Sequence, residues 1–153
     1  MPPAASLAGL VAGHDVVISA TRFQGTDFPV VVDALRKASA ARYLVVGGAA
    51  SLEVAPGKRL LDHPDFPEIY RAEATRGAET LAYLRSIDDL DWTFLSPSAM
   101  LVPGDRTGTF RLGKDELLTG ENGSSISFED YANAMVDEVE SPKHIRQRFT
   151  VGY

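Results

Sequence analysis

Two adjacent glycines at the end of a buried strand are the strongest chemical feature of the sequence. The run from Tyr43 to Gly47 is apolar or small without polar alternation, which predicts a strand covered on both faces, as in a parallel sheet between helices. Gly47 and Gly48 then allow a sharp turn and a close approach to the backbone. Ligands of open α/β sheets bind beyond the carboxyl ends of the strands, so this strand end is a candidate binding site. A tight turn without a ligand is the alternative interpretation.

Residues that usually perform nucleophilic, acid–base or metal chemistry are few and scattered. The chain has no cysteine, which excludes thiolate nucleophiles and cysteine-based metal sites. His14, His63 and His144 have no serine or second histidine at catalytic or metal-ligand spacing, so we expect them to be structural or solvated. The sequence therefore predicts no metal site and identifies no catalytic residue.

Alternating strands and helices must position the strand end. Val16–Ala20 is a second apolar run rich in β-branched residues, and Trp92–Ser96, which Pro97 ends, is a third. A helix over 27–41 joins the first two runs as a right-handed βαβ unit. The alternation predicts an α/β fold with a doubly wound parallel sheet of the Rossmann-like kind and a small C-terminal β/α extension.

Four helices are expected from capping residues and helical periodicity. Gly77, inside the third, marks close packing against a neighbour. In the last helix Asp130 supplies the acidic third position, and Asp137, Glu138 and Glu140 predict a solvated outer face. The helices and their caps are 7–12 (Ser6), 27–41 (Thr26 or Asp27), 65–86 (Asp65) and the last helix from Phe128 (Ser127). The apolar stripes are Tyr70, Ala74, Gly77, Leu81 and Leu84 in the third helix, and Phe128, Tyr131, Ala132, Met135, Val136 and Val139 in the last.

Short glycine- and proline-bounded segments fill the remaining chain. Pro56-Gly57 predicts a turn between the pieces 52–54 and 59–61, and 109–112 with 116–119 are typical of hairpin strands or edge structure. The last residues, 148–153, predict an alternating strand. The chain contains no G-x-G-x-x-G turn of the kind that places a dinucleotide pyrophosphate at a helix N-terminus.

Composition bounds the class of protein. The 153 residues predict one domain over 1–153, with 44% hydrophobic and 24% charged residues, ordinary values for a globular protein with a core. The net charge of −6 disfavours nucleic acid and anionic membranes as partners. No apolar run approaches the length of a membrane span, and the N-terminus lacks a basic, then apolar, secretory signal. A cytoplasmic protein is expected.

Five segments together resemble an atypical short-chain dehydrogenase/reductase. The chain is similar, over essentially its whole length, to the NAD(P)H-binding, flavin-reductase-like group related to biliverdin reductase B. The segments are Gly13–Ala20, Tyr43–Ala49, Asp91–Pro97, Ile126–Ala132 and Arg148–Tyr153.

The resemblance implies a cofactor, NADP or NAD, and a small-molecule substrate such as a flavin or another small planar acceptor. It places successive strand ends along the nicotinamide side of the cofactor, where small residues let a flat ring approach. Ordinary strand-terminating residues are the alternative interpretation. The residues implied as cofactor-binding are Ser19, Ala20, Thr21, Gly47, Gly48, Ala49, Ser96, Pro97 and Ser98.

The resemblance does not extend to the Tyr-x-x-x-Lys proton donor of short-chain dehydrogenases. Ala74 stands four residues after Tyr70, where the family's lysine would lower the tyrosine pKa. Because Tyr70 lies on an apolar stripe, we expect a core tyrosine. Flavin reductases of this kind need little acid–base help, since the cofactor delivers the hydride.

The resemblance also places three further strands and a Gly-rich turn ahead of Ser6, about fifty residues by the size of such units. On this interpretation the chain is the C-terminal portion of the domain and binds dinucleotide poorly by itself. The 16–20 strand becomes an exposed edge, from which we expect a homo-oligomer. Two functions stay open: a reductase, or a non-catalytic binding or regulatory module that has lost the dinucleotide phosphate site.

Overall fold

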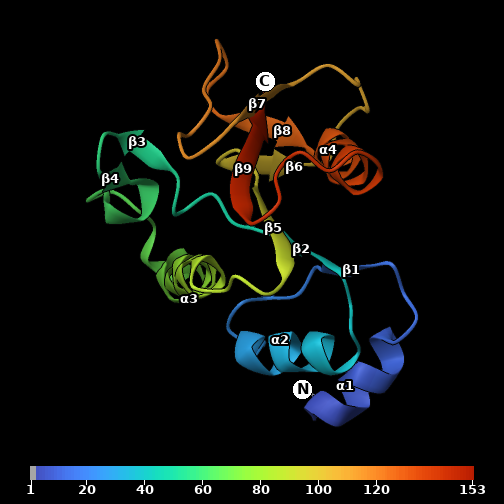
Figure 1. The fold of residues 1–153 in the computed structure, drawn as a ribbon. Coiled ribbons are helices and arrows are strands. Elements are labelled where there is room, and N and C mark those ends of the chain that lie inside the picture. The colour runs from blue at the N-terminus through green and yellow to red at the C-terminus, as the bar shows by residue number, and fades with distance from the viewer. Residues whose placement is uncertain (1–2) are drawn as a thin grey trace.

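A five-stranded sheet between helices organises the protein, and the computed structural model describes it over residues 3–153 (Figure 1). The strand order is β1-β2-β5-β9-β7. Its strands are β1 (Val16–Ser19), β2 (Arg42–Val46), β5 (Asp91–Ser96), β7 (Arg111–Gly113) and β9 (Gln147–Gly152). The helices are α1 (Ala4–Val11), α2 (Phe28–Lys37), α3 (Glu68–Arg85) and α4 (Phe128–Glu140). The smaller elements are β3 (Glu53–Ala55), β4 (Lys58–Arg59), the 3₁₀ helix η1 (Leu60–Asp62), β6 (Met100–Val102) and β8 (Ser125–Ser127).

The predicted α/β fold is confirmed. β1, β2, β5 and β9 are parallel, and only β7 joins antiparallel, beside β9. The carboxyl ends of the four parallel strands therefore meet along one edge of the sheet, where ligands of open α/β sheets bind. Among the described residues, β1 has a strand neighbour on one side only, as the expected sheet edge requires.

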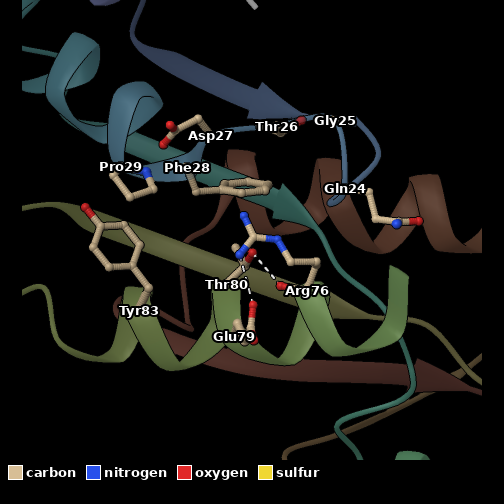
Figure 2. A pocket seen from close by; sticks show the side chains of 10 residues that line it. All are labelled: Gln24, Gly25, Thr26, Asp27, Phe28, Pro29, Arg76, Glu79, Thr80 and Tyr83. Carbon is tan, nitrogen blue, oxygen red and sulfur yellow. Dashed lines mark hydrogen bonds and ion pairs between the residues drawn. The ribbon is translucent and has the colours of Figure 1, made fainter. Parts of the chain in front are cut away.

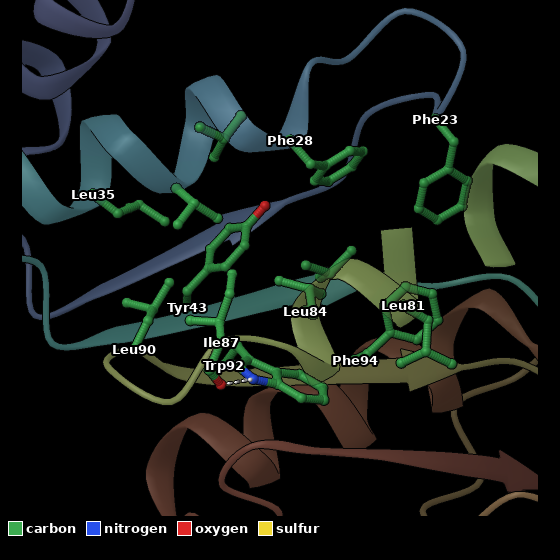
Figure 3. Close-up of a cluster of buried hydrophobic side chains, with 13 residues drawn as sticks. Phe23, Phe28, Leu35, Tyr43, Leu81, Leu84, Ile87, Leu90, Trp92 and Phe94 are labelled. Carbon is green, nitrogen blue, oxygen red and sulfur yellow. Dashed lines mark hydrogen bonds between the residues drawn. The ribbon is translucent and has the colours of Figure 1, made fainter. Parts of the chain in front are cut away.

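Side-chain alternation along the strands builds a core on each face of the sheet. Tyr43 and Trp92 pack beneath α2 and α3, together with Phe94 from the next inward position of β5 (Figure 3). Leu44 and Leu95, one residue out of phase, pack beneath α4. Burial on both faces explains why these strands read as continuous apolar runs.

The Tyr43 hydroxyl gives the first testable prediction, on alkaline stability. The side chain is fully buried, and burial raises the pKa of Tyr43 to about 12, with Ser19 opposing the effect. The folded protein keeps the phenol neutral while the unfolded chain ionises near pH 10. This preference contributes stability that is complete below pH 10 and is lost as the pH rises to about 12, by about 3 kcal/mol over this interval.

Urea unfolding at pH 9 and pH 11 tests this prediction. Tyr43→Phe should lose less stability between the two pH values than the wild type, because the ionising group is gone. Tyr70→Phe is the control, because Tyr70 is 62% exposed. This substitution should leave the pH dependence of the free energy of unfolding as it is in the wild type. Equal losses in wild type and Tyr43→Phe would contradict the assignment.

Two of the predicted helix caps are confirmed and two are wrong. Asp27 accepts a hydrogen bond from the Val30 N–H, and Ser127 accepts one from the Asp130 N–H. Ser6 and Asp65 do not cap, because prolines precede both helices: α1 starts after Pro3 and α3 after Pro67, without a side-chain cap. A proline's fixed φ suits the entry into a helix, so these positions need no capping side chain.

The prediction of a solvated acidic face on α4 is wrong for Glu138. Its side chain is 3% exposed and pairs with Arg42 of β2, with Nη2 and Oε1 separated by 2.9 Å. The expected apolar stripe is also rotated, because Phe128 and Val136 are about half exposed while Ala134 is buried. Glu138 faces inward because a buried arginine on β2 pairs with it, and helical periodicity alone does not contain that information.

For the segments 109–112 and 116–119 the predicted alternative of edge structure is confirmed by β7, which ends the strand order of the sheet, whereas the predicted hairpin is not formed. β7 pairs with β9, and the 116–119 segment forms no strand; Glu116 makes only an isolated bridge to Glu53. The last strand is buried on both faces rather than alternating, because it lies inside the sheet between β5 and β7. The parallel pair β6–β8 was not predicted. The hairpin of β3 and β4 is confirmed, with Gly57 at φ +71° in its turn.

Candidate functional site

A cavity of about 340 Å³ lies beyond the carboxyl end of β2, against α3. Its wall is mainly apolar, and it combines the loops after β1 and β2 with the segment before α3. Sites for small molecules are concave and mostly apolar with a few polar groups, so this cavity is the candidate site. It is lined by Phe23, Gly48, Ala49, Ala50, Ser51, Leu60, Phe66, Tyr70, Glu73, Ala74, Gly77, Ala78 and Ala99.

The two glycines after β2 have different roles. Gly48 lines the cavity, and a methyl group added there would have Cε2 of Phe23 as its nearest neighbour, at 3.8 Å. Gly47 is packed against the sheet: an added methyl group would overlap the Phe94 ring and lie 2.8 Å from the Leu95 carbonyl oxygen. The close approach predicted at Gly47 is therefore made by the protein's own core.

This difference predicts opposite effects of two alanine substitutions. Gly47→Ala should lower the free energy of unfolding by about 1–3 kcal/mol, the usual cost of overpacking, because the Leu95 backbone cannot easily move. Gly48→Ala should leave it unchanged or raise it slightly, since Gly48 has no left-handed φ and the space is open. Urea denaturation of both variants gives the comparison. Equal stability of the two would contradict the packing role of Gly47.

The predicted residues after β1 lie at the same sheet edge but outside the cavity lining. Ala20 and Thr21 are exposed, and the Thr21 hydroxyl accepts a hydrogen bond from the Thr26 hydroxyl at 2.7 Å. Ser19 Oγ lies 3.4 Å from Thr21 Oγ1. Thr26 is buried and Ser19 is half-buried, so of these three residues only Thr21 is exposed beside β1, the open edge of the sheet.

The predicted residues after β5 are buried. Ser98 donates a hydrogen bond to the Val151 carbonyl at 2.9 Å, and the Ser96 hydroxyl accepts one from Arg148 at 3.3 Å. Pro97 is also buried. Ala99, the next residue, lines the cavity instead. Of the nine predicted positions, the cavity itself brings together only Gly48 and Ala49.

Phe23 and Glu73 are cavity residues that sequence reasoning missed. The Phe23 N–H donates to Oε1 of Glu73 at 2.6 Å, and the Gln24 N–H donates to Oε2 at 3.0 Å. The Phe23 ring packs on Phe94 and against Gly77, where an added methyl group would lie 3.1 Å from the ring. The close packing predicted at Gly77 is confirmed, and its neighbour is this ring. No local pattern in the sequence indicated Phe23 or Glu73, because their contact joins positions fifty residues apart.

Tyr70 is not the core residue that its place on the apolar stripe predicted. It is 62% exposed and lines the cavity, with Phe66 from the segment before α3 also in the wall. Tyr70 lies in the first turn of α3, and Leu81 and Leu84 lie in its later turns. The helical stripe therefore changes from core to site along its length: Leu81 and Leu84 are buried, whereas Tyr70 and Ala74 face the cavity.

A buried arginine holds the loop after β2 in place. Nη1 of Arg148 donates to the Ser51 hydroxyl at 2.9 Å, and Nε donates to Asp115 at 2.9 Å. The Arg148 side chain is 2% exposed, and burial lowers its pKa while Asp115 opposes that effect. Because Ser51 lines the cavity, Arg148 is a positioning residue for this loop.

A second cavity, of about 500 Å³, lies between the loop before α2 and the outer side of α3 (Figure 2). Arg76 and Glu79 form an ion pair at 2.9 Å in its wall, with both side chains about half exposed. None of the predicted strand-end residues lines it. We therefore assign the candidate function to the cavity at β2.

Within residues 3–153, no group of three or more histidine, aspartate or glutamate side chains is arranged to hold a metal ion. No helix within the same residues has the length and apolar character needed to cross a membrane.

The parallel sheet, its flanking helices and a cavity at the strand ends define a Rossmann-like protein. The model of the NAD(P)H-binding family matches residues 3–142, and the chain belongs to that family. It is 46% identical over 125 residues to YwnB of Bacillus subtilis, a protein named as uncharacterized. That match covers 79% of this chain and 59% of YwnB, so the chain spans about three fifths of this relative's length.

Two solved structures match nearly the whole chain. One is a Bacteroides thetaiotaomicron protein provisionally named an epimerase, with a TM-score of 0.92 and 40% identity over 98% of this chain and 72% of that one. The other is SP1627 of Streptococcus pneumoniae, provisionally named an NADH-flavin reductase, with a TM-score of 0.77 and 34% identity over 95% of this chain and 74% of that one. Both agree with the resemblance to atypical short-chain dehydrogenases and flavin reductases.

The described residues leave room for a flat ring at the cavity beyond β2. Gly48 presents an open surface toward the cavity, and the small strand-end residues allow a flat ring to approach. The sequence holds no Gly-rich turn for the pyrophosphate. The mainly apolar lining of the cavity is thus suited to a planar ring.

Proposed function

We propose that the protein is an NAD(P)H-dependent reductase of a small planar acceptor, with a flavin as the first candidate. The observation that carries this proposal is the cavity at the end of β2, which the aromatic residues Phe23, Phe66 and Tyr70 line. Aromatic and apolar walls favour a flat ring. The name of the Streptococcus relative supports the choice of a flavin.

In this proposal the side chains bind and orient, and do not transfer protons. When bound, the nicotinamide cofactor supplies the hydride. Gly48 and Ala49 leave room for ring stacking, and the apolar wall excludes water around the acceptor. Of the predicted strand-end residues, Ser19, Ala20 and Thr21 beside β1 are proposed to border the cofactor rather than the acceptor. Ser96, Pro97 and Ser98 are buried and Gly47 is packed against the core, so they support the strand ends from within. Comparison of NADH with NADPH as the hydride donor would identify the cofactor as NAD or NADP.

The test is the oxidation of NADH and NADPH by the purified chain with riboflavin as acceptor, together with calorimetric titration of both dinucleotides. Flavin-dependent oxidation of either dinucleotide supports the reductase. A folded sample that neither binds nor oxidises them favours the non-catalytic module, which the missing Gly-rich turn also favours.

We also propose that copies of the chain associate through β1. This strand has one open edge among the described residues, and Ile18 on it is 46% exposed. An open edge of unpaired backbone groups is a template for strand pairing. Light scattering at micromolar concentration should give at least a dimer, and Ile18→Lys should shift it toward monomer. A monomeric wild type would contradict this proposal.

A further inference from the structure

The walls of the cavity at β2 carry one charge. Of the thirteen residues that line it, Glu73 alone is ionisable near neutral pH, and no lysine, arginine or histidine contributes. Arg71 stacks over the Phe66 ring but pairs with Glu68 at 2.7 Å, outside the lining. Arg22, next to Phe23, is exposed and does not line the cavity either. An anionic ligand would therefore find no counter-charge in this wall.

The Glu73 carboxylate is fixed in place rather than free to swing away. Both oxygens accept backbone hydrogen bonds, from Phe23 and Gln24. These donors are neutral backbone groups, so they fix the position of the carboxylate without adding a counter-charge. Glu73 is only partly buried and shares the wall with the apolar side chains of Leu60 and Phe66. A fixed charge beside apolar walls acts at longer effective range than one in water.

From this arrangement we infer that the cavity selects an uncharged planar ring and that Glu73 excludes anionic acceptors. This inference rests on the proposed function, because it names the substrate class of the same site. Stacking against the aromatic wall attracts a planar ligand, and the Glu73 carboxylate repels a negatively charged one. Specific binding sites commonly combine such attraction and repulsion. Glu73 is thus a specificity-determining residue, in addition to fixing the Phe23 loop.

Binding of two quinones that differ by one charge tests the inference without any dinucleotide. The probes are 1,4-naphthoquinone and 1,4-naphthoquinone-2-sulfonate, measured by calorimetry, and the absence of cysteine removes thiol addition as a complication. The wild type should bind the neutral quinone about tenfold more tightly or better, the order expected for one nearby like charge. Glu73→Gln should bring the two affinities within about threefold by strengthening sulfonate binding.

Glu79→Gln is the matched control, because Glu79 lies on the same helix but lines the cavity of about 500 Å³ instead of the cavity at β2. This variant should keep the wild-type preference for the neutral quinone. Glu73→Gln keeps an oxygen that can accept the Phe23 N–H, and Glu73→Ala removes both the charge and the acceptor. Equal binding of the two quinones by the wild type, no binding of either, or an equal weakening of both in Glu73→Gln would overturn the inference. The last outcome is what a purely structural Glu73 gives. A failure of reductase turnover alone would instead count against the proposed function.

Discussion

Replacing Glu138 with alanine is expected to lower the free energy of unfolding by about 3–5 kcal/mol, the cost of breaking a buried ion pair from one side. Glu138 holds the Arg42 guanidinium at 2.9 Å, and the same carboxylate accepts the backbone N–H groups of Lys143 and His144 at 3.0 and 2.8 Å. Its second oxygen lies 2.8 Å from Nδ1 of His144. Alanine leaves the buried Arg42 charge without its partner and frees the turn after α4.

Urea denaturation with Glu140→Ala as the control measures this effect. Glu140 lies on the same helix and is exposed, so its substitution should change stability by less than about 0.5 kcal/mol. Glu138→Gln, which keeps an acceptor oxygen but not the charge, should fall between the two. A loss below 1 kcal/mol for Glu138→Ala would show that the network contributes little and that Arg42 finds another partner.

Gly48→Leu is expected to reduce flavin turnover by about 100-fold or more while the protein stays folded. The Cβ position at Gly48 is free, but the branched part of a leucine side chain would occupy the space that the acceptor ring needs. Displacing a bound ring by about 1 Å can already cost a factor of about 100. Thermal unfolding monitors the fold, and steady-state kinetics with riboflavin monitor the site.

Gly48→Ala provides the size series, with an expected effect on turnover of less than about tenfold because a methyl group makes only ordinary contact with Phe23. Wild-type turnover in Gly48→Leu would place the acceptor elsewhere. A variant that unfolds would be replaced by Ala49→Leu, whose side chain lines the same cavity.

The strands of the sheet can be predicted from the sequence, whereas few of the residues that line the cavity can. Val16–Ala20, Tyr43–Gly47 and Trp92–Ser96 were predicted as strands within one residue at either end, because burial on both faces leaves an uninterrupted apolar run. The doubly wound class follows from that alternation. The C-terminal extension was harder to predict, because β6 and β8 are short and pair across 22 intervening residues, from 103 to 124.

At the site, the small residues at the end of β2 predicted Gly48 and Ala49 as ligand-binding positions. The sequence could not show that Gly47 is different, because only the packing of Phe94 and Leu95 behind Gly47 excludes it from the cavity. Phe23 and Glu73 meet through contacts fifty residues apart in the chain, and no local pattern reports such a pairing. Tyr70 and Glu138 were misassigned for one reason: helical periodicity tells which residues share a face, but not how far the neighbouring layer extends or what it carries.

Backbone amide NMR during a riboflavin titration tests the central claim, that the cavity at the end of β2 receives the planar acceptor. The account predicts that shift changes concentrate on Phe23, Gly48 and Gly77, which surround the cavity from three elements, and that Gly48→Leu abolishes them. Changes confined to the other cavity, around Thr26 and Thr80, or no binding by the folded protein, would contradict it.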